Sequence, residues 1–291
     1  MDGILLLNKP QNMTSHDCVN LIRKLMHTKK VGHIGTLDPL ATGVLPICIN
    51  DATKIIQFID KADKEYIATI YLGYSTTTMD RSGEIVEKDD TYKTISRELL
   101  LDTLKKFIGK QKQTPPLFSA VKVKGKKLYE YARDNIPVNI ASRDIEIYSI
   151  ELLSSEEVFS GKEIIFSIRI FCSKGTYIRT LANDIGKILG SPSHLYDLIR
   201  TKSGAFSLED CYSFSEIEKG NYHLVSIYDA LSSYPRIEVT EDIKLKVIYG
   251  QKINLDVNNF TKVVLCDKFK NVLAVYEKEG SLFRPIRVLA N

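Results

Sequence analysis

Apolar residues recur along this chain with a period of two or in short continuous runs, and both patterns predict strands. Alternation over 64–73 predicts a strand that places Tyr66 and every second residue after it on one side. Apolar runs predict short buried strands at 3–7 and 44–49 and a longer one at 163–171. These segments are the candidates for a buried sheet.

Other segments carry apolar residues at helical spacing. This spacing predicts helices over four ranges, namely 14–30, 52–62, 96–109 and 178–189. In the first of them Val19 and Ile22 fall on one face, and Thr14 or Ser15 supplies the N-cap. Helices and strands follow one another in no regular order, which favours an α+β or mixed α/β fold over a doubly wound sheet.

A polar turn at 232–239, which contains Pro235, marks a domain boundary. A helix over 241–250 and three short strands follow it. We therefore expect a large domain over 1–232 and a small β-rich domain over 236–291. A domain of about fifty residues is near the lower size limit for independent folding, so this one is expected to lean on its neighbour.

Composition narrows the cellular context. The 291 residues are 44% hydrophobic and 26% charged, which fits one large domain or a large and a small one. The five cysteines are scattered and never spaced as C-x-x-C, which argues against a disulfide scaffold or a thiolate metal site. The N-terminal apolar run is too short for a signal peptide or a membrane helix. We expect a soluble cytoplasmic protein with no membrane partner.

Positive charge is concentrated in one part of the chain. Residues 105–133 hold nine Lys or Arg and one acidic residue, so this stretch carries +8 although the whole chain carries +4. Such asymmetry suggests a polyanionic partner, and Phe118, Tyr129 and Tyr131 among the lysines suit base stacking beside phosphate contacts. A solvated basic face, with the aromatic side chains in the core, is the alternative that charge alone leaves open.

The segment GHIGTLDPLATGVLPI, residues 32–47, holds one acid, Asp38, among glycines and small or apolar residues. Glycines permit close backbone approaches and Pro39 disfavours a helical conformation at Asp38, so this carboxylate is expected on a shaped loop. On spacing alone such an acid is more often a turn former than a catalyst. The chain has no H-E-x-x-H, Walker A, G-x-G-x-x-G or G-x-S-x-G motif, so metal, nucleotide and serine-hydrolase chemistries lack their signatures.

Several segments together resemble a known family. GHIGTLDPLATGVLPI is similar to the catalytic motif of the bacterial tRNA pseudouridine-55 synthases, the TruB-type family. Further matches follow in order: LLLNKPQNMTSHDCV, KEYIATIYLGYSTTTMD, PPLFSAVKVKGKKLYEYAR, CSKGTYIRTLANDIG and LIRTKSGAF. The resemblance implies a mixed-sheet α+β catalytic domain with an RNA-binding insertion at about 105–135. It also implies that the small C-terminal domain is a PUA-like RNA-binding domain.

The resemblance implies a reaction as well. Members of this family isomerise uridine 55 in the T loop of tRNA, so we expect a monomeric enzyme that binds the T stem-loop, flips the base and uses no cofactor or metal. Asp38 matches the essential aspartate, Tyr66 the tyrosine that stacks on the target base, and Arg179 the arginine that pairs with the aspartate. The implied substrate-binding positions are Lys9, His33, Phe118, Lys124, Lys126, Lys127, Tyr177, Leu198 and Arg200.

Chemistry explains these residue types. The enzyme must break a glycosidic C–N bond, turn the uracil and rejoin it through C5, which requires a closed, dry pocket. One carboxylate attacks C1′ of the ribose or takes a proton from C2′, and the sequence leaves both open. Either role needs an ionised aspartate. Burial disfavours that charged form, whereas a neighbouring guanidinium favours it, which is a physical reason for Arg179.

The chain departs from the family pattern in places. Phe118 replaces a frequent tyrosine, and Ile199 replaces the first arginine of a pair, which leaves Arg200. Two other functions stay open. One is an RNA-binding protein that grips the T arm without chemistry, although binding alone needs no buried acid. The other is a guide-RNA type of pseudouridine synthase acting on ribosomal RNA, whose relatives are expected to lack the basic insertion.

Overall fold

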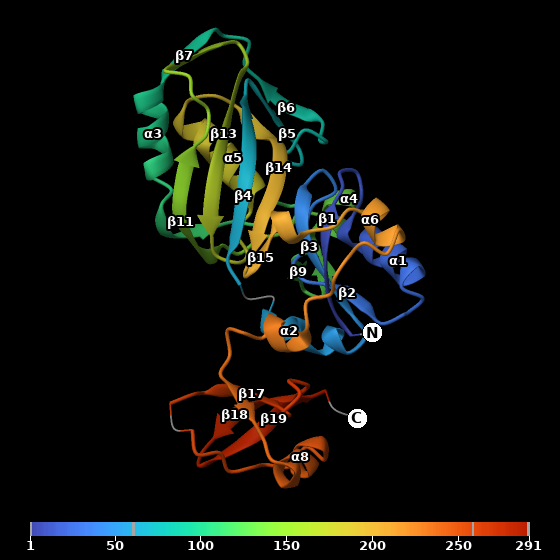
Figure 1. Ribbon diagram of the computed structural model, residues 1–291. Coiled ribbons are helices and arrows are strands. Elements are labelled where there is room, and N and C mark those ends of the chain that lie inside the picture. Colours follow the sequence, from blue (N-terminus) through green and yellow to red (C-terminus); the bar gives the residue numbers. More distant parts are fainter. Residues whose placement is uncertain (1, 60–61, 258, 290–291) are drawn as a thin grey trace. The chain divides into compact units, whose positions relative to one another are not determined.

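The computed structural model describes residues 2–59, 62–257 and 259–289. The chain divides into two compact units, and most of their helices and strands are labelled in Figure 1. The first unit consists of Met1–Asp38, Val44–Lys61 and Ala205–Asn291, and the second of Pro39–Gly43 and Ala62–Gly204. Within the described part of the chain, no helix combines the length and the apolar character needed to cross a membrane.

The second unit is built on one mixed sheet, whose strands lie in the order β14-β4-β13-β11-β8. These strands are β4 (Lys64–Leu72), β8 (Gly109–Gln113), β11 (Arg143–Leu152), β13 (Ile164–Cys172) and β14 (Ser193–Ser203). Neighbours in this order are antiparallel, whereas Thr42 and Gly43, at the start of β3 (Thr42–Ile49), pair in parallel with β14. The mixed sheet and the α+β class are as predicted.

Two helices pack against this sheet and against each other, α3 (Arg97–Lys105) and α5 (Ile178–Ile188) (Figure 1). The alternation predicted for β4 is observed, because Tyr66, Ala68 and Ile70 are buried and the residues between them are half-buried. Two further strand pairs complete the unit. They are β5 (Tyr74–Thr76) with β6 (Ile85–Lys88) and β7 (Lys93–Ser96) with β12 (Val158–Gly161).

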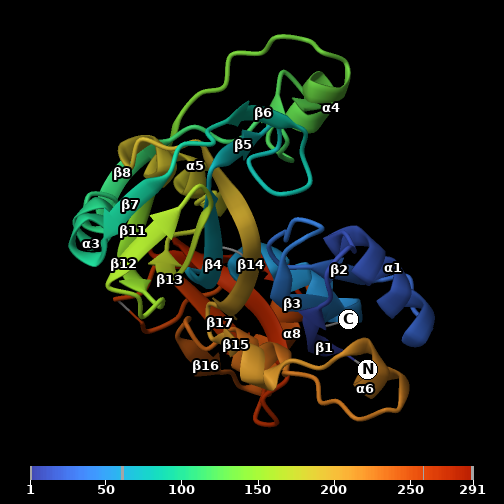
Figure 2. The ribbon, with the colours of Figure 1, turned by 90° about the horizontal axis from the view of Figure 1, so that it is seen from above.

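A long arm leaves the sheet after β8 and returns at β11, as Figure 2 shows from above. It carries a short hairpin of β9 (Lys122–Val123) and β10 (Lys126–Lys127), followed by helix α4 (Leu128–Arg133). The hairpin turn contains Lys124 and Gly125, both with positive φ. The basic stretch found in the sequence therefore covers β8 and most of this arm.

The first unit begins with β1 (Gly3–Lys9), helix α1 (Ser15–Leu25) and β2 (Val31–His33), and β1 and β2 flank β3. Thr14 caps α1, because its hydroxyl accepts from Asp17 N at 3.0 Å and the Asp17 carboxylate accepts from Thr14 N at 2.9 Å. Shorter elements follow: α2 (Ile56–Ile59), β15 (Phe206–Ser207), α6 (Phe214–Glu218) and α7 (Ile227–Ala230).

The C-terminal part of this unit is a four-stranded sheet with one helix. The sheet has the order β16 (Arg236–Glu238), β17 (Lys262–Cys266), β18 (Val272–Glu279) and β19 (Leu282–Val288), and the helix is α8 (Glu241–Ile248). Along β17, Val263 and Leu265 enter the core of this module, whereas Val264 joins a cluster with Ile4 and Phe58. The sheet therefore buries side chains on both of its faces, and one of these faces shares a core with β1 and α2.

The α-helix predicted over 52–62 is mostly a 3₁₀ helix. The range 52–62 forms a 3₁₀ helix over Asn50–Ile55 and only one α-helical turn in α2, and residues 60 and 61 lie outside the described part. Ala52, Ile55 and Phe58 are buried, and their spacing of three matches the three residues per turn of a 3₁₀ helix. The buried positions thus follow the tighter period.

Candidate active site

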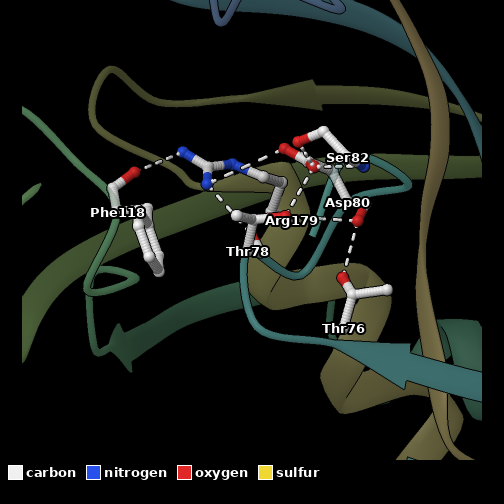
Figure 3. A network of polar contacts seen from close by, with 6 residues as sticks. All are labelled: Thr76, Thr78, Asp80, Ser82, Phe118 and Arg179. Carbon is white, nitrogen blue, oxygen red and sulfur yellow. Dashed lines mark hydrogen bonds and ion pairs between the residues drawn. The ribbon is translucent and has the colours of Figure 1, made fainter. Parts of the chain in front are cut away.

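Arg179 lies at the start of helix α5 and is its second residue, with a side chain that is 5% exposed. Its Nη1 donates to the Thr78 carbonyl at 3.0 Å, and Nη2 donates to the Phe118 carbonyl at 2.9 Å (Figure 3). Nη1 also lies 3.9 Å from Oδ2 of Asp80. Because these acceptors come from three directions, the buried guanidinium is held in one orientation.

Asp80 supplies the carboxylate of this network, and its own turn holds it in place. Oδ1 accepts from Thr78 Oγ1 at 2.7 Å, from Ser82 Oγ at 2.5 Å and from Ser82 N at 3.0 Å. Thr76 Oγ1 donates to the Asp80 carbonyl at 2.6 Å and closes the turn (Figure 3). With three donors on Oδ1, Oδ2 is the oxygen that faces Arg179. The turn thus places a fixed negative charge beside a buried cation.

Backbone hydrogen bonds attach this turn to strand β14. Leu195 N donates to the Met79 carbonyl at 3.0 Å, and Arg81 N donates to the Leu195 carbonyl at 3.2 Å. Met79 has a φ of 61°, the left-handed conformation that sharpens the turn. A Cβ on Gly83 would lie 2.6 Å from Thr78 Oγ1, so a side chain there would displace a donor to Asp80. The position of the carboxylate therefore depends on the sheet.

Asp38 lies on a loop of the first unit, as predicted, and the residue before it is clamped. The Ser15 hydroxyl accepts from Leu37 N at 2.9 Å and donates to the Leu37 carbonyl at 3.0 Å. Ser15 is 1% exposed, Leu37 is buried and Asp38 is half-buried. Because Ser15 begins α1, the start of that helix fixes the backbone from which the Asp38 carboxylate projects.

Lys9, at the end of β1, is fully buried, and it shapes the segment that leads into α1. Its Nζ donates to the carbonyls of Pro10 at 2.9 Å and Met13 at 2.7 Å. Asn12 within this segment has a φ of 65°, which asparagine tolerates. Lys9 thus supports the helix start that carries the Ser15 clamp. His33, the last residue of β2, is half-buried opposite Ile47 of β3.

Tyr66, Leu198 and Arg200 come together on the neighbouring strands β4 and β14. Tyr66 is buried opposite Arg200, and Leu198 is buried opposite Ala68. Gly43 lies beside Arg200 with a φ of +101°, and a Cβ there would lie 2.3 Å from the Arg200 carbonyl oxygen. Arg200 is 1% exposed. Arg200 stays a predicted substrate-binding position, and its burial places it within the sheet, between Tyr66 and Gly43.

The basic arm places cations over tyrosine rings. Lys127 Nζ lies 5.3 Å from the centre of the Tyr129 ring, and Lys126 Nζ lies 5.3 Å from the centre of the Tyr131 ring. Lys126 also pairs with Asp134, which reduces the local positive charge. We call Lys124, Lys126 and Lys127 the hairpin lysines. Both rings are half-buried, so they keep exposed surface beside the lysines.

Two further predicted positions lie at the base of the arm and at the start of α5. Phe118 is half-buried, and its backbone carbonyl, rather than its ring, contacts Arg179. Tyr177 is the N-cap of α5, and its side chain is half-buried. The sequence did not reveal Asp80 as a neighbour of Arg179, nor that Arg179 donates to the backbone carbonyls of Thr78 and Phe118. The only signal for Asp80 was its place at the end of the matching segment KEYIATIYLGYSTTTMD.

Burial keeps two titratable side chains of the second unit, His194 and Cys172, in their neutral forms. His194 Nδ1 lies 3.0 Å from the Tyr74 carbonyl, which can only accept, so Nδ1 carries the hydrogen. Burial lowers the pKa of His194, whose ring stacks near Tyr71 and Tyr74. Burial also raises the pKa of the Cys172 thiol to about 12, so this thiol is no nucleophile at neutral pH. In the residues that the structure covers, no group of three or more His, Cys, Asp or Glu could hold a metal ion.

Solved structures share this fold. A chain of a Cbf5-Nop10-Gar1 complex superposes with a TM-score of 0.73 at 24% identity, covering 99% of this chain and 84% of that one. A chain of an H/ACA RNP bound to a substrate RNA containing 2′-deoxyuridine gives a TM-score of 0.72 at 22% identity, covering 99% and 85%.

Sequence relatives define the class and then the family. Residues 23–178 match the TruB family pseudouridylate synthase (N terminal domain). The tRNA pseudouridine synthase B of Bacillus cytotoxicus is 46% identical, with 100% of this chain and 98% of that protein covered. The protein of the same name from Halalkalibacterium halodurans is 44% identical with the same coverage. The fold and these matches define a pseudouridylate synthase. The chain belongs to the TruB family, as its motifs indicated.

Proposed function

We propose that this protein converts uridine 55 in the T loop of tRNA to pseudouridine. One observation carries the proposal: the chain is 46% identical over its whole length to proteins named tRNA pseudouridine synthase B. It keeps Asp38, Tyr66 and Arg179 at the positions that the family motifs require. We further propose that it acts as a cytoplasmic monomer without a cofactor.

In the proposed reaction Asp38 is the essential acid. The carboxylate attacks C1′ or takes the C2′ proton while the C1′–N1 bond breaks, and the freed uracil turns so that C5 bonds to C1′. In the first case the aspartate–C1′ bond breaks as C5 bonds, and in the second Asp38 returns the proton to C2′, so the carboxylate is regenerated. N1 gains a proton and C5 loses one, so the product is an isomer of the substrate. The Ser15 clamp on Leu37 supports this role, because a catalytic carboxylate must keep its position to within a fraction of an ångström.

Tyr66 and Arg179 are the proposed partners of the acid. Tyr66 offers a flat ring for the flipped base and a phenol that could relay the C5 proton. The guanidinium of Arg179 supplies fixed positive charge that favours the ionised aspartate. Its hydrogen bonds to Thr78 and Phe118 mean that no large reorientation is needed during the reaction. Leu198 and His33 are proposed to line the nucleotide pocket.

The hairpin lysines are proposed to grip the RNA backbone. Three cations on one short hairpin provide phosphate contacts, and the adjacent rings of Tyr129 and Tyr131 provide stacking surfaces. A hairpin loop suits this recognition, because its bases are already poorly stacked and cost less to flip. We therefore propose the T stem-loop as the unit of recognition.

The residues 236–291 are proposed to form a PUA-like RNA-binding domain after a catalytic domain over 1–232. A group of cations beside aromatic rings, formed by Arg236, Lys268 and Lys270 with Tyr228 and Phe269, supports RNA binding. Arg236 Cζ lies 4.3 Å and Lys270 Nζ 5.6 Å from the centre of the Tyr228 ring. Lys268 Nζ lies 5.1 Å from the ring of Phe269, whose side chain is 73% exposed. Exposed cations beside exposed aromatic surface suit a nucleic acid better than a protein core.

Tritium release from tRNA that carries [5-³H]uridine, combined with mapping of the pseudouridine, tests the proposal. We expect release from position 55 by the wild type and none by Asp38→Asn, with tRNA affinity unchanged to within a few-fold. The control is Asp51→Asn, which removes a partly exposed carboxylate that pairs with Lys54 at 3.1 Å. This control should turn over at the wild-type rate.

The same assay separates the alternatives. Binding of the T arm by the wild type without release would favour an RNA-binding protein, and pseudouridine at another site would favour a different substrate. An isolated T-arm hairpin should be converted with at most about tenfold lower kcat/KM, about 1.4 kcal/mol. An inert hairpin beside active full-length tRNA would refute recognition of the T arm alone.

A further inference from the structure

Helix α5, which carries Arg179, begins without a side-chain cap of its own. Its N-cap residue is Tyr177, whose side chain makes no capping hydrogen bond. The side-chain amide of Gln113 takes over both backbone groups of this residue. Gln113 Oε1 accepts from Tyr177 N at 2.7 Å, and Gln113 Nε2 donates to the Tyr177 carbonyl at 3.0 Å. A side chain that is distant in sequence therefore sets where α5 starts.

The chemistry of the side chain explains why an amide is needed. One group must accept from an N–H and another must donate to a C=O, and both must lie on one short planar unit. Gln113 is 7% exposed, so water does not substitute readily for either bond. A carboxylate of the same shape would keep the first bond and place an oxygen against the Tyr177 carbonyl oxygen.

Gln113 also stands at the root of the basic arm. It is the last residue of β8, where it pairs with Arg143 of β11, and the arm begins at the next residue. The first residues of the arm then contact the first turn of α5. Thr180 Oγ1 donates to the Thr114 carbonyl at 3.4 Å, and Arg179 donates to the Phe118 carbonyl at 2.9 Å. Of these four hydrogen bonds, the one from Tyr177 N to Gln113 Oε1 is the shortest, at 2.7 Å.

We infer that Gln113 is a positioning residue that fixes Arg179 and the root of the RNA-gripping arm to each other. When both hydrogen bonds of the Gln113 amide are intact, α5 starts at a fixed place and the Phe118 carbonyl stays in register with the guanidinium. When they are lost, the first turn of α5 and the base of the arm loosen together. The inference rests on the proposed function for its effect on catalysis, but the structural coupling does not depend on it.

Gln113→Glu is the sharpest variant, because it preserves size and shape. At pH 8 we expect kcat to fall about tenfold to a hundredfold, as loss of a buried hydrogen bond and an added oxygen–oxygen contact imply. Affinity for tRNA should stay within threefold of wild type, because the hairpin lysines are unchanged. Gln111→Ala is the matched control. Gln111 lies on the same strand and donates to the carbonyl of Phe107, a residue outside α5, at 2.5 Å. Its kcat should match the wild type.

A pH profile distinguishes positioning from a general loss of structure. Protonation of the carboxylate introduced by Gln113→Glu would give it one donor and one acceptor, as the amide has, and burial favours that neutral form. The activity of Gln113→Glu relative to wild type should therefore recover several-fold between pH 8 and pH 6. Gln113→Ala has no group to protonate and should show no recovery.

Hydrogen exchange followed by mass spectrometry gives a readout that needs no activity. In Gln113→Glu at pH 8, exchange should accelerate in peptides covering 174–182 and 114–121, and remain unchanged in peptides from the C-terminal sheet. Wild-type kcat in Gln113→Glu, a defect confined to tRNA affinity, or unchanged exchange in both peptides would overturn the inference. If the wild type forms no pseudouridine but the exchange pattern appears, the proposed function fails and the coupling stands.

Discussion

Replacing Asp80 with Asn removes the negative charge beside Arg179 and leaves the shape of the side chain intact. The amide oxygen can still accept from Thr78 and Ser82, so the turn should keep its conformation. The other atom becomes an NH₂ group, which faces the guanidinium where Oδ2 stood 3.9 Å from Nη1. The perturbation is therefore electrostatic.

Its size follows from this geometry. Two unit charges 3.9 Å apart attract by about 4 kcal/mol at an effective dielectric constant of about 20. The neutral variant also avoids the cost of burying a carboxylate, and Arg179 keeps its bonds to the Thr78 and Phe118 carbonyls. We therefore expect Asp80→Asn to lose about 1.5–3 kcal/mol of this attraction, because the guanidinium of Arg179 is then positioned less firmly. As a rise in the activation barrier, this loss corresponds to a fall in kcat of about tenfold to 150-fold.

Tritium release at saturating tRNA measures this kcat, and filter binding measures the affinity. Asp184→Asn is the control. Asp184 lies on helix α5, which also carries Arg179, and it pairs with Lys187 at 2.8 Å at an exposed position. Exposed pairs contribute about 0–1 kcal/mol, so this control should stay close to wild type. A kcat of Asp80→Asn within twofold of wild type, with the protein folded, would refute the reasoning that Asp80 orients Arg179.

Three further outcomes follow from the same contacts. Ser15→Ala removes both bonds to Leu37, so kcat should fall at least tenfold with tRNA affinity kept; an unchanged kcat would contradict the clamp. Replacing the hairpin lysines with Glu should make the fall of log affinity with log salt less steep, by up to about 0.9 for each lost duplex phosphate contact. An unchanged slope would mean that they face solvent. Burial lowers the pKa of His194 in the folded protein, so as the pH falls the imidazole is protonated in the unfolded chain before it is protonated in the folded one. The free energy of unfolding should therefore decrease as the pH drops through about 6.5, by at most about 1.4 kcal/mol per pH unit. His194→Gln should lose this dependence of the unfolding free energy on pH, and a variant that keeps it would show that another group is responsible.

Much of the molecule could be predicted from local pattern. Alternation located β4, apolar spacing located α5, and the candidate N-caps Thr14 and Ser15 located the start of α1, where the structure selects Thr14. These features depend on residues within about one turn or one strand, so they leave a periodic trace in the sequence. The Asp38 loop could be predicted in the same way, because glycine and proline restrict the backbone locally. The family followed from the resemblance of several motifs that occur in order along the chain.

Only the tertiary structure revealed what holds the candidate site together. Arg179 meets Thr78 and Phe118 across 101 and 61 residues of chain, and Gln113 meets Tyr177 across 64. Contacts between backbone carbonyls and distant side chains impose no spacing on the sequence, so no periodicity announces them. Burial of Arg200 is of the same kind, since it depends on the strands on either side of β14. Local patterns predicted the elements and the family resemblance suggested the reactive residues, whereas pairing between distant strands and turns decided how those residues are oriented.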